Sequence, residues 1–506
     1  MVSKVPLGAI AGVVGFLVLV EFTSGILQGY YVPLLTDIAR FLNIRDGDVN
    51  FFEGAQLMVS ALVVPALAKL GDMVGHKRML LVSTAITAVA SVALAFSPVF
   101  WVFLIAWALQ GAYVVWLPLE VALVFSRSRA LGNPAAITRK AAGFLVAGLE
   151  LGVIAGALGG GAIADSLFPT TEQRKGLEPA QLQAALAEHM WLLLIIPAVC
   201  VVICFFVILF GVKESPDLTG GRLDYMGLAL ISAALLVLTA GLSFMRVTGP
   251  ENWLPWTAIA LGVLLVVPFV RYELKQDDPL IDIRMFRQRA MWPILVTAGL
   301  FGVSVLGAQA PLSTFARTDP EAHGFGLGAT GGQVSILIGI YVVSLLVGAL
   351  VYPQVTRFFA PRRVLMAAAG LIAVGYFLFI PLHDTMPQLL INIAVAGIGS
   401  GALVAALPAA AAAVAPRTQT GVATGLTNTT KTIGGAFASC VFGIALISRV
   451  SASGAEQTAG TIEGYYTVWI VCGVTALVAA VLLIFVPKGA FEDKRGAEEP
   501  VVSEVR

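Results

Sequence analysis

Hydrophobic residues fill long stretches of this chain, and short polar segments separate one stretch from the next. The hydrocarbon core of a bilayer is about 30 Å thick, so a helix of about 20 apolar residues can span it. Stretches of that length predict fourteen membrane-spanning helices. Their expected ranges are 7–34, 51–70, 79–98, 101–125, 141–165, 190–212, 226–245, 254–274, 291–315, 331–353, 364–382, 387–415, 421–447 and 465–486.

Positive charge is unevenly distributed among the polar segments. Cytoplasmic segments of membrane proteins are enriched in Lys and Arg, and an even number of spans places both termini on one side. A cytoplasmic N-terminus leaves seven of the 31 basic residues outside, which favours that orientation. These seven basic residues are Arg40, Arg45, Arg174, Lys175, Arg246, Arg317 and Arg449.

We also expect the polar tail 488–506 to be disordered in the cytoplasm.

Two short patterns occur twice along the chain in the same order. Residues 111–118 of the fourth span read GAYVVWLP, and residues 401–408 of the twelfth span read GALVAALP. The segment 72–80 after the second span has a weaker counterpart, 357–365, after the tenth. Spans 1–6 are therefore expected to correspond to spans 9–14, with spans 7 and 8 inserted between them. Secondary transporters are commonly built from such repeated bundles.

Composition excludes most classes of soluble protein. Of the 506 residues, 58% are hydrophobic and 12% are charged, against about 25% charged residues in a soluble domain. A soluble enzyme, a nucleic-acid reader and a disordered scaffold are therefore excluded. The four cysteines lie within apolar stretches, so we expect packing residues rather than disulfides or a metal site. They are Cys200, Cys204, Cys440 and Cys472.

The segment after the second span carries a recognisable motif. Residues 68–78 read AKLGDMVGHKR, in which Asp72, Gly75, Lys77 and Arg78 match the motif G-x-L-A-D-R-x-G-R-R/K. On this motif the chain resembles the major facilitator superfamily, and within it the fourteen-helix drug:proton antiporter family. The resemblance implies a gating role for the motif, in which a carboxylate at a helix end accepts backbone N–H groups or pairs with a cation. The alternative is a basic turn that only sets orientation.

Three other spans resemble the same family. Residues 148–161 of the fifth span, with Gly152, Gly156 and Gly160 at a spacing of four, are similar to its antiporter signature, although Ala157 replaces a proline. These glycines are expected to serve either gating or close helix packing. In the fourth span Gln110 and Gly111 match a family pair, but Trp107 stands where the family has an arginine tied to proton transfer. In the thirteenth span, Asn428 and Lys431 match a family stretch in which Lys replaces Arg.

Three carboxylates lie deep within expected spans, where each ionised side chain costs about 2.5–3.5 kcal/mol. Glu21 occupies the acidic position of the family motif D-x-T. Gly25 and Gln28 follow it on the same helix face, and this open polar stripe suits the wall of a cavity. Glu150 points away from the glycines of the fifth span, and Glu120 lies in the inner part of the fourth. We expect at least one of the three to be protonated near neutral pH and to couple transport to protons. The alternative is a structural pair with a cation or a hydroxyl.

Other polar and aromatic residues within or beside the spans have weaker functional signals. Tyr113 and Trp116 are candidates for a binding pocket that stacks a flat or cationic ligand. Asp37, Glu53 and Asp165 lie at expected outer boundaries and are expected to be solvated.

These observations predict an all-α integral membrane protein with the major facilitator fold. We expect a six-helix bundle at 1–213, two inserted helices at 214–290, a second six-helix bundle at 291–487 and a tail at 488–506. The expected function is proton-coupled export of small amphipathic or cationic compounds, without enzymatic activity. The alternatives are a proton-coupled symporter that imports a small solute and a non-transporting membrane sensor.

The same reasoning defines the expected partners. A proton gradient drives transport, and we expect no cofactor, no metal and no nucleic acid. The partners are a small-molecule substrate, protons and the lipid bilayer, and the chain is expected to be a monomer in a bacterial cell membrane.

Overall fold

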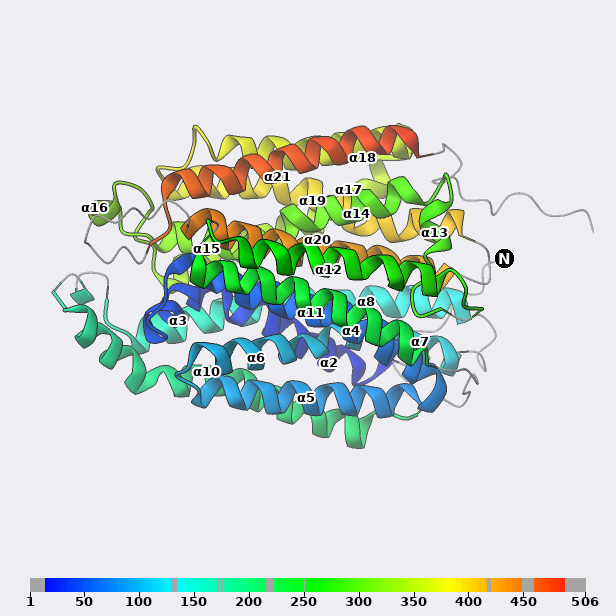
Figure 1. The fold of residues 1–506 in the computed structure, drawn as a ribbon, viewed down its shortest axis with the longest axis horizontal. Coiled ribbons are helices and arrows are strands. Elements are labelled where there is room, and N and C mark those ends of the chain that lie inside the picture. Colours follow the sequence, from blue (N-terminus) through cyan, green and yellow to red (C-terminus); the bar gives the residue numbers. More distant parts are fainter. Residues whose placement is uncertain are drawn as a thin grey trace, which may run out of the picture.

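A computed structural model describes residues 14–128, 134–170, 173–174, 176–214, 223–249, 251–277, 279–415, 420–447 and 459–486. Within this part of the chain, fourteen helical segments are long and apolar enough to span a membrane, as the hydrophobic pattern predicts. The start of the first expected span, 7–13, and the tail 488–506 lie outside the described residues. The described elements are helices and connecting loops, and the helices run nearly parallel to one long axis (Figure 1).

The first six spans form one group of packed helices, here called the N bundle, and the last six form the C bundle. The N bundle consists of α2 (Leu17–Tyr30), η1 (Val32–Leu34), α3 (Leu35–Phe41), η2 (Asp46–Val49), α4 (Asn50–Val74), α5 (His76–Phe96), α6 (Phe100–Gln110), η3 (Gly111–Val115), α7 (Trp116–Ser128), α8 (Pro134–Leu167) and α10 (Pro179–Gly211). The C bundle consists of α14 (Trp292–Val305), α15 (Gln309–Arg317), α16 (Pro320–His323), α17 (Gly331–Val355), α18 (Pro361–Leu378), α19 (Met386–Val414), α20 (Thr420–Ile447), α21 (Ile462–Leu482) and η5 (Leu483–Phe485).

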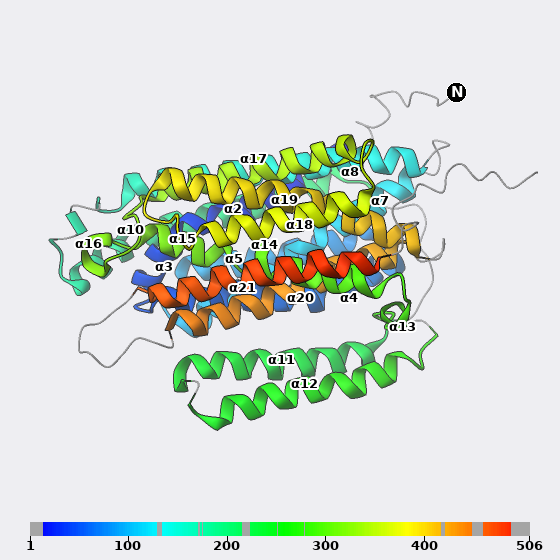
Figure 2. The same cartoon turned by 90° about the horizontal axis from the view of Figure 1, so that it is seen from above.

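The two remaining spans, α11 (Tyr225–Thr248) and α12 (Trp253–Glu273), pair with each other beside the bundles. Figure 2 shows this pair set apart from the other helices, and α11 contacts both α4 and α20. A short helix, α13 (Arg284–Arg287), follows and leads into the C bundle. We call the two ends of the molecule the α13 end and the α15 end. The distribution of basic residues predicts that the α15 end is outside.

Corresponding spans of the two bundles are interrupted at corresponding places. Pro33 cannot donate a backbone hydrogen bond, and the first span changes there from α2 through η1 to α3. The ninth span breaks between α14 and α15, just before Pro311. In each bundle the short helix after the break, α3 or α15, therefore carries the chain to the α15 end.

The bundles pack against each other in a symmetric way. The second span of each bundle lies against the fifth span of the other, so α4 contacts α20 and α17 contacts α8. The glycines of the repeated pattern also have the same role in the two bundles, which is to allow close approach to a neighbouring helix. A Cβ on Gly111 would meet the Gln56 carbonyl oxygen at 2.5 Å, and a Cβ on Gly401 would overlap the Leu345 carbonyl oxygen. The repeat inferred from residues 111–118 and 401–408 thus has a structural basis in close approach of the fourth and twelfth spans to the second and tenth.

The glycine face of α8 packs directly on α2. Gly152 lies against the backbone of Phe22 and Gly25, and Gly156 and Gly160 lie against successive turns of α2. A side chain at these positions would overlap backbone atoms, which cannot move aside as a flexible side chain can. Of the two expected roles for these glycines, the structure provides the evidence for close packing.

Replacing Gly152 with alanine should therefore destabilise the protein by about 1–3 kcal/mol, because the new methyl group overpacks the contact with α2. Gly159→Ala is the matched control in the same helix, since no atom lies within 4 Å of its added Cβ. That variant should be neutral or more stable by about 0.5–1 kcal/mol, because alanine favours the helix. Thermal unfolding of the purified proteins in detergent compares them. Equal stability of the two variants would contradict the close approach.

The orientation is tested with single cysteines at opposite ends. Phe358 lies between α17 and α18 at the α13 end and is 83% exposed. Gly176 lies between α8 and α10, and a Cβ there meets only the Gln173 carbonyl oxygen at 3.7 Å. In intact cells a membrane-impermeant maleimide should label G176C at once, and F358C only after the membrane is permeabilised. The parent chain supplies the background from its own cysteines, and labelling of F358C in intact cells would reverse the orientation.

Candidate functional site

The deepest acidic residues of the N bundle lie together. Glu21 of α2 and Glu120 of α7 are both 0% exposed, and their carboxyls lie within hydrogen-bonding reach of each other. Among the described residues, no N–H or O–H group donates to any of the four carboxyl oxygens. The tertiary structure therefore brings together two acids that lie almost a hundred residues apart in the chain.

The expected open stripe along α2 does not form a continuous cavity wall. Gly25 lies against the backbone of Leu149 and Gly152 in α8, so this position is filled by helix packing. Gln28 is exposed, whereas Glu21 is buried within the bundle. The interpretation of Glu21, Gly25 and Gln28 as one open face was wrong because the first span buries its glycine side against α8.

Two ionisable residues of opposite type come from different bundles. Glu150 lies midway along α8, within electrostatic range of Lys431 in α20. Tyr341 of α17 also lies within electrostatic range of Glu150. Each bundle therefore contributes one ionisable side chain to this region.

A small cavity in the C bundle adjoins Lys431. Its lining includes Asn428 and Lys431 of α20, and Pro408 of the repeated pattern in α19. Asn428 and Lys431, which the family resemblance singled out, thus share one surface. The cavity offers a polar amide and a charged group on otherwise apolar walls. The remaining lining residues are Ala298, Phe301, Leu403, Val404, Leu407 and Thr427.

Gln110 links three helices of the N bundle. Its side-chain amide donates to the Tyr31 hydroxyl at 2.9 Å and to the Ser91 hydroxyl at 2.7 Å. Trp107, at the position where the family has an arginine, stacks on Phe52 with ring centroids 5.5 Å apart and also packs on Tyr31. An aromatic cluster therefore occupies the place of a cation, which explains how the helix tolerates the replacement.

The two aromatic pocket candidates are packed within the N bundle. Trp116 is completely buried, and its indole N–H donates to the Ser83 hydroxyl of α5 at 3.1 Å. Tyr113 in η3 is 5% exposed and meets the Trp116 ring edge-on. Stacking on a ligand would require both rings to leave this arrangement. In the described state they are core residues.

The motif between α4 and α5 is organised by a residue that the motif does not contain. Asp72 contacts the His76 ring nitrogen Nε2 at 3.0 Å, within its own loop. The backbone N–H groups of Lys77 and Arg78 instead donate to the Glu214 carboxylate at 2.9 and 3.2 Å. These two backbone N–H groups therefore have Glu214 as their acceptor, and the expected gating role of Asp72 stays a prediction. Glu214, which follows α10, caps the start of α5, while Gly75 adopts a positive φ of 123° to make the turn.

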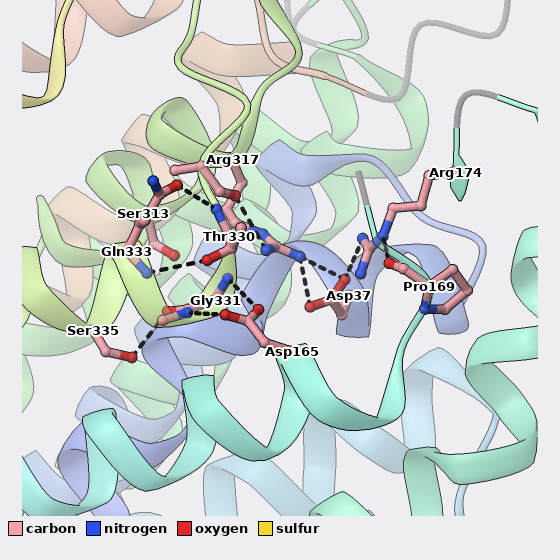
Figure 3. Close-up of polar contacts among 12 residues, drawn as sticks. Asp37, Asp165, Pro169, Arg174, Ser313, Arg317, Thr330, Gly331, Gln333 and Ser335 are labelled. Carbon is pink, nitrogen blue, oxygen red and sulfur yellow. Dashed lines mark hydrogen bonds and ion pairs between the residues drawn. The ribbon is translucent and has the colours of Figure 1, made fainter. Parts of the chain in front are cut away.

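An ionic cluster joins the bundles at the α15 end (Figure 3). Both Asp37 oxygens accept hydrogen bonds from the Arg317 guanidinium at 2.7 Å, and one also accepts from Arg174 at 2.7 Å. Asp37 belongs to α3 of the N bundle and Arg317 to α15 of the C bundle. Asp37 is 0% exposed and the Arg317 side chain 6%, so the expectation that Asp37 is solvated was wrong.

Further hydrogen bonds join the bundles around this cluster. The Asp165 carboxylate of α8 accepts the Gly331 and Gly332 N–H groups at the start of α17, each at 2.9 Å. Asp165 is exposed, as expected, yet it caps a helix of the other bundle. The Ser335 hydroxyl donates to the Ala157 carbonyl oxygen at 2.6 Å, and Ser313 donates to Val32 at 2.5 Å. These contacts between the bundles close the α15 end. Glu53, which was expected to be solvated, is half-buried.

Sequence reasoning missed this closure, although one signal was present. Asp37 and Arg317 stand at the ends of the first and ninth spans, which correspond in the internal repeat. Opposite charges at corresponding ends of two repeats indicate a contact across the symmetry axis. The hydrophobic pattern alone placed both residues at a solvated boundary.

Comparison with known proteins gives a consistent result. Residues 294–505 match the family model described as the Major Facilitator Superfamily. The chain is similar to the quinolone resistance protein NorB of Staphylococcus aureus (strain MRSA252), with 25% identity over 296 residues. This alignment covers 57% of the chain and 61% of NorB, so the chain matches about three-fifths of the length of this relative.

Solved structures share the fold over nearly the whole chain. A bacterial homologue of the human lysosomal transporter Spinster, in an inward-facing and unoccupied conformation, has a TM-score of 0.63 at 12% identity, covering 96% of this chain and 98% of that one. The nucleoside transporter NupG has a TM-score of 0.60 at 14% identity, covering 94% of this chain and 98% of that one. At these identities the likeness concerns the fold.

Two symmetric helical bundles of candidate membrane spans define a multi-pass membrane protein that shares the fold of these solved transporters. The similarity to the Major Facilitator Superfamily model covers residues 294–505.

The ionic cluster should control access from the α15 end. In Asp37→Asn, Arg317 and Arg174 lose their shared charge partner. Losing a charged hydrogen bond costs about 1.5–3 kcal/mol, so the closed arrangement should open about 10–100-fold more often. The readout is the labelling rate of a cysteine placed at Ser313, which is 1% exposed at the bundle interface.

Asp319→Asn is the control for this experiment, because Asp319 lies at the same end and only caps α16 within the C bundle. Its labelling rate should equal that of the parent. Equal rates for Asp37→Asn and the parent would show that the cluster does not hold the closed state.

Proposed function

We propose that this protein is a proton-coupled exporter of small amphipathic or cationic compounds. The main support is that the two bundles bring an acid, Glu150, and a base, Lys431, within electrostatic range of each other. A carboxylate within an apolar layer attracts an organic cation strongly, because the surrounding dielectric is low. When no cationic compound is bound, Lys431 is the positive group that stabilises the Glu150 carboxylate.

The name of one relative supports the class of compound. NorB is named for quinolone resistance, and quinolones are flat amphipathic drugs. The surface of Asn428 and Lys431 beside Phe301 combines polar and apolar groups suited to such a molecule. This makes a quinolone and a cationic dye the first compounds to test.

Alternating access supplies the physical cycle. The α15 end is closed by Asp37, Arg317 and Asp165, and export requires these contacts to break when the site opens to that side. Loading from the α13 end while the α15 end is closed is the order that export demands. The motif at Asp72 and the Glu214 cap lie at the α13 end, the side from which the compound would be loaded.

Proton coupling is assigned to the membrane-embedded carboxyls. Trp107 removes the arginine of the family relay, so protons must be carried by acids such as Glu21, Glu120 and Glu150. A carboxyl that binds a proton on one side and releases it on the other couples the gradient to the conformational cycle.

Glu21→Gln should abolish proton-driven accumulation and leave exchange of substrate down its own gradient intact. Glutamine keeps the size and hydrogen-bonding capacity of glutamate but cannot titrate. Glu150→Gln should either do the same or weaken binding of cationic compounds. The measurement is flux of a cationic dye and a quinolone in proteoliposomes with the pH gradient imposed in each direction, with binding measured separately.

Glu251→Gln, at an exposed position between α11 and α12, is the control and should transport like the parent. Uphill transport that persists in the Glu21→Gln, Glu150→Gln double variant would contradict coupling through these two acids. Accumulation with the gradient reversed would identify an importer, and binding without flux in the parent would identify a sensor.

A further inference from the structure

Glu21 and Glu120 form an arrangement that two ionised carboxylates could not maintain. Both are fully buried, their carboxyls are within hydrogen-bonding reach, and none of their four oxygens has a donor among the described residues. Two negative charges in contact would repel each other strongly where the dielectric is low. Burial without a partner adds the cost of removing both charges from water.

The surroundings offer no other compensation. The Thr23 hydroxyl, two residues from Glu21 in α2, donates to the Leu19 carbonyl oxygen at 2.9 Å. The titratable neighbours are Cys204 of α10 and Tyr113 of η3, which are neutral groups near pH 7. No basic side chain forms an ion pair or hydrogen bond with either glutamate in the part of the chain that the structure describes.

A single proton removes the repulsion and reduces the number of buried charges from two to one. When one carboxyl is protonated, its O–H donates to the other carboxylate and forms a short, charge-assisted hydrogen bond. The pair then carries one negative charge instead of two. Two acids that share a proton titrate as one unit rather than as separate residues.

The geometry points to a one-proton binding site formed jointly by Glu21 and Glu120 inside the N bundle. The inference rests on the proposed proton coupling and deepens it, because the coupling site becomes a carboxyl pair instead of a single acid. The ligand is a proton rather than a metal ion, since hard cations take six or more oxygen ligands and the adjoining Thr23 hydroxyl is already bonded.

The pair is also separate from the charges at the bundle interface. Glu150 interacts with Lys431, whereas Glu21 and Glu120 interact with each other. One acidic unit is thus available for the proton and the other for a cationic substrate. Because the proton and the cationic substrate bind at different carboxyls, neither has to displace the other directly.

Infrared spectroscopy of the purified protein tests the pair without any transport measurement. The parent at neutral pH should show the C=O band of a hydrogen-bonded carboxylic acid, which shifts in D2O. Glu21→Gln and Glu120→Gln should each abolish this same band, because the glutamine amide replaces the O–H as donor to the remaining carboxylate. The double variant should lose nothing further in this region, and Glu251→Gln should keep the band. Thermal unfolding of each variant checks that it is folded.

A band that persists in either single variant would overturn the shared site, because the remaining acid would then hold a proton alone. Transport separates this failure from that of the proposed function. If the band behaves as expected but proteoliposomes show no proton-driven flux, the pair stands and the coupling is wrong. If flux is proton-driven and Glu120→Gln retains both the band and full coupling, the coupling stands and the pair is wrong.

Discussion

A charge buried in a lipid-facing protein must find its partner within the protein, because neither the hydrocarbon nor the packed core supplies water. This constraint governs every polar cluster described here. Asp37 obtains two guanidinium groups, Glu150 obtains Lys431 across the bundle interface, and Glu21 and Glu120 have only each other. The location of each charge is therefore also the location of a contact between distant parts of the chain.

These contacts differ in what they hold together. The Asp37 cluster connects α3 with α15, so it depends on the relative position of the bundles. The Glu21–Glu120 pair lies within one bundle. A rocking motion of the bundles would therefore break the Asp37 cluster and keep the two carboxyls of the pair together.

Close glycine packing makes this geometry possible. The approach of α2 to α8 through Gly152 and its neighbours brings backbones together and turns Glu150 away from α2. In the other bundle, Gly302 of α14 lies against the backbone of Lys431 in α20, the corresponding pair of spans. Small residues thus fix the rotation of the two helices that carry the interfacial charges. The cost of adding a single methyl group at these sites is a direct measure of that constraint.

The sequence by itself determined the spans, their number and the internal repeat. The spans and their number follow from runs of about 20 apolar residues. The repeat follows from the spacing that residues 111–118 and 401–408 share. It also identified Glu21, Glu120 and Glu150, because an ionisable residue in an apolar run is conspicuous wherever the fold places it, while Lys431 was identified from the family resemblance.

Only the tertiary structure decided which of these residues meet. Sequence reasoning treated Asp37 as a solvated boundary residue and Gly25 as part of an open wall, and it did not single out Glu214, which caps the start of α5. Each of these contacts involves a partner from a distant segment of the chain. Whether a polar residue is solvated, packed or paired depends on what the fold places beside it, and hydrophobic periodicity carries no information about contacts between helices far apart in the chain.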